Sequence, residues 1–154
     1  MDVKSTLKIF NQADHAGRRG VIDGQSYQRL VGWPEVQETD RVRIGRATYK
    51  PGSHELLHWH PIEACYYVIS GHATVRNLEG EEFEVSAGSM IYAPPGIAGA
   101  HEWEVKEALE LLDIRATNET NRKIQYTVDR ETKRSYIDIE DLEYREAISF
   151  KSHY

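Results

Sequence analysis

The sequence contains very little cysteine, which limits the chemistry that the chain can use. Cys65 is the only cysteine among 154 residues, so the chain can form no internal disulfide bond and no all-cysteine zinc site. A protein without disulfides suits a reducing compartment, and we therefore expect a cytoplasmic location.

Basic charge and long apolar runs are also scarce. The 19 Lys and Arg residues are outnumbered by 25 Asp and Glu residues, which gives a formal charge of −6. This balance argues against a nucleic-acid partner, because phosphate contacts need clustered basic side chains. No apolar run approaches the length of a membrane span, and the first six residues lack the pattern of a secretory signal. We expect no membrane partner.

The remaining composition suits one globular domain. Apolar residues make up 40% of the chain and charged residues 29%, which is typical of a folded protein rather than a disordered one. We expect a single domain over residues 1–154. Its parts are an N-terminal arm (1–24), a barrel core (25–117) and a C-terminal extension (118–154).

Short β-type runs alternate with glycine and proline over most of the chain, and this pattern predicts an all-β sandwich or barrel. A tight hairpin is expected around Gly80, because glycine adopts positive φ without steric cost. The apolar spacing in 138–149 suits a short helix, although it would also suit a strand. The expected strands are 26–30, 41–49, 64–70, 72–78, 82–85, 90–93, 101–105 and 109–116, with 123–128 as a further candidate.

His58 and His60 are separated by one residue on a segment that we expect to be extended. Side chains alternate between the two faces of a strand, so both imidazoles should point to the same side. Imidazole is the commonest protein ligand for transition metals. The pair therefore indicates half of a metal site.

Two motifs in the middle of the chain resemble those of the cupin family. In the first, Gly52, His58, His60 and Gly71 stand at the family's spacing. In the second, residues 88–96 (GSMIYAPPG) match the family's glycine, five residues and Pro-x-Gly. The resemblance implies a double-stranded β-helix, or jelly-roll, barrel. It also implies one divalent transition metal, held by three histidines and a glutamate.

The position of the glutamate departs from the family's pattern. Ala64 occupies the usual place, and the nearby acidic residue is Glu63. A shift of one residue in a regular strand turns a side chain to the opposite face. Glu63 is therefore a candidate ligand only if the turn at Pro61 changes the register.

The third histidine is also displaced. Its usual place is Gly99, and His101 lies two residues further along the chain. A shift of two residues keeps the same strand face, so His101 can still point into the barrel. The predicted metal ligands are thus His58, His60 and His101, with Glu63 as the candidate fourth.

Aromatic and basic side chains are expected near this site. Tyr66 shares strand parity with Ala64, and Trp103 shares it with His101, so we predict that both aromatic residues line the substrate pocket. Three arginines on predicted strands are candidates for holding a substrate carboxylate, and the sequence does not say which one points inward. They are Arg43, Arg46 and Arg115.

The leading hypothesis is a metal-dependent cupin enzyme that acts on a small metabolite, with aromatic and carboxylated compounds as the expected classes. Zn, Fe, Mn, Ni and Cu all remain open, as do oxygenase, lyase or decarboxylase, and isomerase or cyclase chemistry. No catalytic acid or base is assigned. The alternative is a non-catalytic, small-molecule-binding cupin. We also expect a homodimer, because pairing protects open strand edges.

Overall fold

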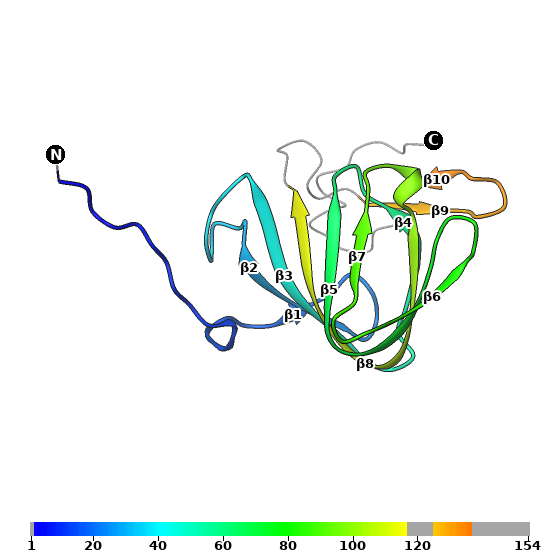
Figure 1. The fold of residues 1–154 in the computed structure, drawn as a ribbon, viewed down its shortest axis with the longest axis horizontal. Coiled ribbons are helices and arrows are strands. Elements are labelled where there is room, and N and C mark those ends of the chain that lie inside the picture. Colours follow the sequence, from blue (N-terminus) through cyan, green and yellow to red (C-terminus); the bar gives the residue numbers. More distant parts are fainter. Residues whose placement is uncertain (1, 117–124, 137–154) are drawn as a thin grey trace.

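A computed structural model describes residues 2–116 and 125–136, which contain ten strands, all paired antiparallel, and two short 3-10 helices (Figure 1). The helices are η1 (Gln12–Asp14) and η2 (Ile97–Gly99). The strands are β1 (Arg18–Arg19), β2 (Gln25–Val31), β3 (Val42–Tyr49), β4 (His54–Trp59), β5 (Ala64–Arg76), β6 (Glu82–Ser86), β7 (Met90–Ala93), β8 (His101–Ala116), β9 (Tyr126–Val128) and β10 (Ser135–Tyr136). The predicted all-β fold is confirmed.

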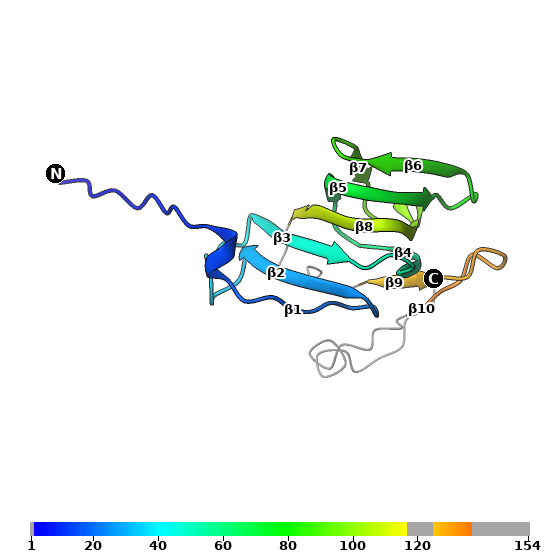
Figure 2. The ribbon, with the colours of Figure 1, turned by 90° about the horizontal axis from the view of Figure 1, so that it is seen from below.

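The strands form two facing layers that share the long strands β5 and β8 (Figure 2). One path of paired strands runs β1-β2-β3-β8-β4-β9-β10, while β5 pairs with β6, β7 and β8. The pairing of β5 with β8 changes register at three points between Val68 and Ala73, and such irregularities let strands bend. The result is the predicted jelly-roll barrel.

Segments that were expected as separate strands are continuous. Residues 64–70 and 72–76 belong to the single strand β5, and residues 101–116 form the single strand β8. The expected break at Gly71 is a bend with a φ of +92°. A Cβ added to Gly71 would overlap the carbonyl oxygen of Ala108 on β8, so glycine permits the close approach of the two strands here.

The hairpin predicted around Gly80 is confirmed. Arg76 on β5 pairs with Glu82 on β6, and Gly80 has a φ of +87° in the connection between them. Of the candidate strand 123–128, residues 126–128 form β9. The candidate helix at 138–149 lies outside the described residues. Within the described residues, no helix is long and apolar enough to span a membrane.

The core lies between the two layers and follows the alternation of side chains along the strands. On β3, Arg43, Gly45, Ala47 and Tyr49 are buried, and the residues between them are partly exposed. The buried residues of the main apolar cluster are Ala47, Tyr49, Ala64, Tyr66, Val68, Ala73, Val75, Val85, Ala93, Trp103, Val105, Leu109 and Leu111. A smaller cluster joins β4 to β9 and consists of Leu57, Trp59, Ala100, Tyr126 and Val128.

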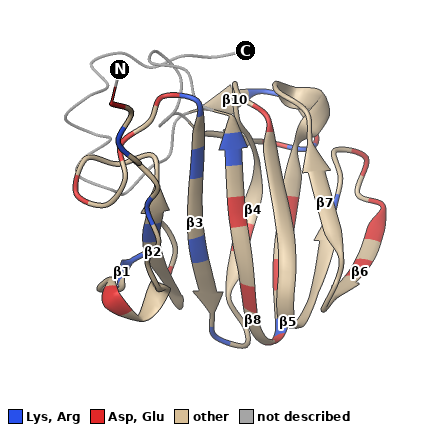
Figure 3. Ribbon diagram, turned by 60° about the vertical axis from the view of Figure 1, so that its left-hand side comes forward, with Lys and Arg blue, Asp and Glu red and all other residues tan. Residues whose placement is uncertain are grey.

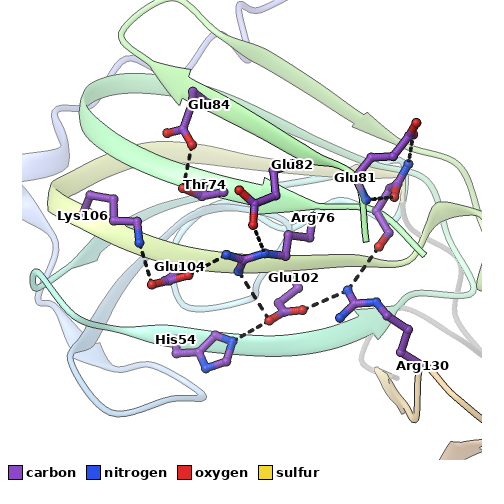
Figure 4. A network of polar contacts seen from close by, with 11 residues as sticks. His54, Thr74, Arg76, Glu81, Glu82, Glu84, Glu102, Glu104, Lys106 and Arg130 are labelled. Atoms are coloured by element: carbon purple, nitrogen blue, oxygen red, sulfur yellow. Dashed lines mark hydrogen bonds and ion pairs between the residues drawn. The ribbon is translucent and has the colours of Figure 1, made fainter. Parts of the chain in front are cut away.

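A network of ion pairs crosses the outer surface of the barrel (Figure 4). Glu102 on β8 contacts His54 at 2.8 Å, Arg130 at 2.9 Å and Arg76 at 3.7 Å. Glu102 thereby joins β8 to β4, to β5 and to the segment after β9.

Candidate metal centre

Strands β4 and β8 bring together the three histidines that the sequence singled out. His58 on β4 lies directly opposite His101 on β8, and His60 follows the end of β4. Each ring offers a nitrogen atom, and these three atoms all lie within 4.8 Å of one another. The centroid of the His58 ring is 4.4 Å from that of His101 and 5.0 Å from that of His60. All three side chains are buried.

The residue between the paired histidines points the other way, as strand alternation requires. Trp59 stacks on Tyr126 with ring centroids 4.2 Å apart, and its indole nitrogen donates a hydrogen bond to Ser135 Oγ at 2.8 Å. Strands β9 and β10 therefore cover the outer side of the segment that carries His58 and His60. This packing fixes the direction of both imidazoles.

Backbone carbonyl groups orient two of the three rings. His58 Nδ1 lies 2.7 Å from the carbonyl oxygen of Leu56, and His101 Nδ1 lies 2.8 Å from that of Gly99. A carbonyl oxygen can only accept, so each Nδ1 carries the proton and each Nε2 is left unprotonated. A nitrogen in this state is ready to bind a metal ion.

Burial keeps the histidines neutral. It lowers the pKa of His58 to about 4 and that of His101 to about 3, and it holds the pKa of His60 well below its ordinary value. The positive charge of Arg115 lowers the pKa of His60 further. Since metal ions bind neutral imidazole, the three rings carry the required charge at neutral pH. Three neutral, buried imidazoles fit a divalent transition metal.

His60 differs from the other two because its Nδ1 faces a guanidinium group. Nη1 of Arg115 lies 3.4 Å from His60 Nδ1, and the Tyr66 hydroxyl lies 3.3 Å from His60 Nε2 and 3.2 Å from His101 Nε2. Since guanidinium can only donate, the hydrogen-bond pattern assigns the His60 proton to Nε2, directed at the Tyr66 oxygen. This proton has to leave Nε2 before that atom can bind a metal ion.

The structure explains why the third histidine does not stand at position 99. Gly99 ends the 3-10 helix η2, and a Cβ added there would overlap the carbonyl oxygen of Pro94. No residue larger than glycine fits without a shift of the backbone. His101 is the first residue of β8, from which its ring reaches the other two.

Glu63 is not brought to the histidines. Ala64 points into the core and is 1% exposed, whereas Glu63 is exposed and its carboxylate accepts a hydrogen bond from the Tyr92 hydroxyl at 2.7 Å. The change of register at Pro61 that a ligand role requires is therefore not seen. The position of Glu63 gives that role no support.

A different carboxylate, which sequence reasoning missed, lies beside the site. Glu55 Oε1 is 3.5 Å from His58 Nε2, and the Glu55 side chain is 10% exposed. Glu55 and His58 are three positions apart, so regular alternation would place them on opposite faces. A register shift in the pairing of β4 with β8 between these two residues turns both toward the inside. The sequence carries no clear signal of this bulge.

A cavity of about 520 Å³ adjoins the histidines. Three of its lining residues, Glu55, Tyr66 and Arg115, each contact a histidine ring. Tyr66 thus lies where the sequence predicted a pocket residue. Trp103 belongs instead to the core, 3% exposed, with its ring edge-on to Tyr66 at 5.4 Å, and it is not among the residues that line the cavity.

Residues 45–115, which include the three histidines, match the family model of the cupin domain. The barrel is a cupin domain. This assignment confirms the family and the fold that the two sequence motifs predicted.

The proteins that share sequence with this chain are longer than the segments that align with it. Over 112 residues the chain is 27% identical to a mannose-1-phosphate guanylyltransferase of Salmonella montevideo, an alignment that covers 71% of this chain and 22% of that protein. Over 74 residues it is 34% identical to an uncharacterized protein of Methanocaldococcus jannaschii, which covers 47% of this chain and 58% of that protein. The chain thus spans less than two thirds of the length of either relative.

Solved structures share the cupin fold. The polyketide cyclase RemF from Streptomyces resistomycificus superimposes with a TM-score of 0.68 and 18% identity, covering 80% of this chain and 87% of that one. An oxalate decarboxylase from Bacillus subtilis and a DMSP lyase from Ruegeria pomeroyi are further structures with this fold. At such low identities the likeness concerns the fold alone.

Substitution of Glu55 and of Glu63 tests which of the two carboxylates supports metal binding. We expect Glu55→Gln to weaken binding of Zn²⁺ by about 10–100-fold, as loss of a group next to a metal ligand commonly does. The buried Glu55 carboxylate favours positive charge beside His58. Titration calorimetry of the metal-free protein measures the affinity. Glu63→Gln makes the same charge change at an exposed position and should leave the affinity unchanged, and equal losses in the two variants would contradict the geometry.

Proposed function

We propose that this protein is a metal-dependent cupin enzyme that acts on a small aromatic or carboxylated metabolite. The observation that carries the proposal is the convergence of three buried, neutral histidine rings, whose ligand atoms lie within 4.8 Å of one another. His58, His60 and His101 would hold one divalent transition metal. When bound, the metal would supply Lewis acidity toward a carbonyl, enol or hydroxyl oxygen.

Two side chains between the histidines and the cavity are suited to handle protons. Burial raises the pKa of Glu55 above the ordinary carboxyl value, which moves it toward the range useful for acid–base catalysis near neutral pH. Burial also raises the pKa of Tyr66, so its hydroxyl stays protonated and can donate a hydrogen bond to a substrate oxygen. The apolar core behind Tyr66 excludes water from this side of the site.

Several structures with the same fold are enzymes, among them a cyclase, a decarboxylase and a lyase. This supports a catalytic function. These enzymes do not select a reaction, because one fold carries many activities.

The alternative is a non-catalytic cupin that binds a small molecule. The observation in its favour is the departure from the usual donor set: Ala64 occupies the glutamate position, and Glu63 points away. In that case the cavity would bind its ligand without converting it.

Metal content separates the two functions. Protein purified without a histidine tag should contain close to one equivalent of a divalent metal by elemental analysis, and it should convert members of a panel of phenols and keto acids. Metal-free protein that carries a tightly bound organic ligand would support the binding function instead. Protein with neither metal nor ligand, and no metal affinity, would contradict the proposed enzyme.

We also propose a cytoplasmic homodimer. The single cysteine suits a reducing compartment. Exposed apolar side chains gather on β5 and β7, where Tyr67 pairs with Met90, and a second copy of the chain would cover them. Light scattering that shows a monomer would contradict the dimer.

A further inference from the structure

The outer face of the sheet carries two rows of apolar side chains that run across neighbouring strands. Residues that lie directly opposite each other on paired strands point to the same face. The pairing of β3 with β8, of β8 with β5 and of β5 with β7 therefore aligns side chains from four strands. The first row is Ile44, Ile114, Cys65 and Tyr92, and the second row is Leu112, Tyr67 and Met90. We call these seven residues the apolar rows.

The apolar rows are most accessible on β5 and β7. Met90 is 60% exposed, Tyr92 57% and Tyr67 39%. Strand β7 carries no charged residue and is tan along its length in Figure 3, whereas the neighbouring strand β6 carries red bands. Contiguous exposed apolar surface that is bordered by charge commonly marks a place where another molecule binds.

A second exposed apolar surface lies on the extended segment formed by residues 2–10. Val3, Leu7 and Ile9 are 86%, 77% and 88% exposed. Their odd-numbered positions place them on one face of an extended chain. Within the described residues, no main-chain hydrogen bond joins this segment to another part of the chain. Segment 2–10 thus has the pattern of an amphipathic strand without a partner.

Segment 2–10 starts from the same face of the sheet that carries the apolar rows. On β2, Nε2 of Gln28 donates hydrogen bonds to the carbonyl oxygens of Gln12 at 3.1 Å and His15 at 2.9 Å. Oε1 of Gln28 accepts one from Nη1 of Arg46 at 2.9 Å, and Arg46 lies opposite Leu112 of the second row. The segment therefore leaves the barrel at the β2 edge of this face. Figures 1 and 2 show that it leads away from β5 and β7.

The length of segment 2–10 matches the width of the face. An extended residue spans about 3.3 Å, so nine residues reach about 30 Å. Neighbouring strands are about 4.8 Å apart, so the distance from β2 across β3, β8 and β5 to β7 is about 19 Å. The segment can therefore cross a whole face of this size. Since it leads away from its own apolar rows, the rows that it can cover in this arrangement are those of a second copy.

The charges of the two surfaces are complementary. Segment 2–10 contains Lys4, Lys8 and one acidic residue, Asp2, and is thus positive by one charge in a chain with a net charge of −6. At the β7 end of the apolar rows, the exposed carboxylate of Glu63 accepts a hydrogen bond from Tyr92, and β6 adds two exposed glutamates. Opposite charges at the border of an interface favour association and set its orientation.

We infer that the apolar rows on the outer face of β3, β8, β5 and β7 bind segment 2–10 of a second copy of this chain. The side chains of Val3, Leu7 and Ile9 would pack on the rows, and the lysines between them would face the acidic border. The inference rests on the proposed homodimer. It adds the segment that each copy contributes and the face that receives it.

The affinity between the two copies tests the contact from the side of segment 2–10. In Leu7→Asp the dissociation constant of the dimer should rise at least about 100-fold, because each of two copies loses a buried leucine and each burial is worth about tenfold or more in affinity. Thr6→Asp adds the same charge on the opposite face of the segment and should keep the wild-type constant. Sedimentation velocity over a range of protein concentrations measures both constants.

The receiving face is tested in the same way. Met90→Asp should also weaken the dimer at least about 100-fold. Phe83→Asp is the control: Phe83 is 50% exposed but pairs with the core residue Val75, so it belongs to the other face of the sheet and its loss should leave the dimer unchanged. All four variants should keep the wild-type metal content, because none of the changed residues belongs to the metal site.

Chemical cross-linking shows which copy the segment covers. Cys65 belongs to the apolar rows and is the single cysteine of the chain, so it marks the receiving face. A size-tagged chain with Leu7→Cys and Cys65→Ser is mixed with the untagged wild-type chain and treated with a short bis-maleimide. The expected product is a tagged chain joined to an untagged one. Thr6→Cys in place of Leu7→Cys should give several-fold less of this product.

The outcomes distinguish this inference from the proposed function. An unchanged dissociation constant in Leu7→Asp, or equal effects of Leu7→Asp and Thr6→Asp, would overturn the inference and leave the proposed homodimer standing. In a chain with Leu7→Cys that retains Cys65, a link closed within one chain would show that the segment covers its own rows, and would overturn the inference too. A monomer at every concentration would contradict both the homodimer and the inference, but not the metal site, which the metal content tests independently.

Discussion

Replacement of two histidines, His58→Ala with His60→Ala, should abolish metal binding. Loss of one group that merely supports a metal ligand costs about 10–100-fold in affinity, so loss of two ligands should cost well over about 100-fold. Only His101 would remain of the three nitrogen donors that lie within 4.8 Å of one another. Elemental analysis after dialysis against equimolar Zn²⁺ measures the loss.

The matched control removes two imidazoles from the surface. The His54 side chain is 46% exposed and pairs with Glu102, and the His72 side chain is 37% exposed and pairs with Glu84. The variant His54→Ala with His72→Ala should therefore keep the wild-type metal content. If this control lost metal to the same extent, or if the first variant kept it, the three-histidine site would be wrong.

The metal-free protein should lose stability as the pH falls from 7 to 5. The unfolded chain binds a proton on each histidine near pH 6.5, but burial lowers the pKa of His58 to about 4 and of His101 to about 3, and lowers that of His60 as well. Below pH 6.5 the unfolded state thus holds more protons than the folded state, so the free energy of unfolding decreases as the pH falls. Each such histidine contributes a slope of about 1.4 kcal/mol per pH unit.

Urea unfolding in EDTA, followed by circular dichroism at pH 7, 6 and 5, measures this slope. For His58 alone, the full change between pH 6.5 and about 4 is of the order of 3 kcal/mol. The slope should be smaller in the variant His58→Ala with His60→Ala and unchanged in the variant that lacks His54 and His72. A stability that stayed constant from pH 7 to pH 5 would show that the rings are not buried in the neutral form.

Much of the fold could be predicted because glycine, proline and period-2 alternation mark strands locally. What the sequence could not predict is where two segments continue as one strand. Gly71 looked like a turn residue, yet its contact with Ala108 depends on the approach of β8, which is distant in sequence. The same limit applies to the pairing of β5 with β8 as a whole.

The candidate site was predictable where it follows strand parity and unpredictable where parity is broken. His58 and His60 alternate regularly, and His101 keeps the expected face, so the sequence singled out the three rings that the structure brings together. Glu55 could not be found in this way, because the bulge in β4 lies between it and His58.

The arginines illustrate the same point at the other end of the cavity. Arg43 and Arg46 are three residues apart and must face opposite sides of β3, but the sequence does not say which side is the interior. The space above Gly45 decides it, because Tyr27 from β2 fills that space and reaches Asp113.

The sharing of β5 and β8 between both layers also determines how molecules can reach the interior. Separation of the layers would break main-chain hydrogen bonds along both long strands. We therefore expect that the two layers do not move apart by a hinge motion when a ligand enters. Within the described residues, small molecules can reach the cavity past the parts of its lining that belong to no strand, such as residues 20–23 and Gln125. Selection by size then falls to these segments, while the walls supply the chemistry.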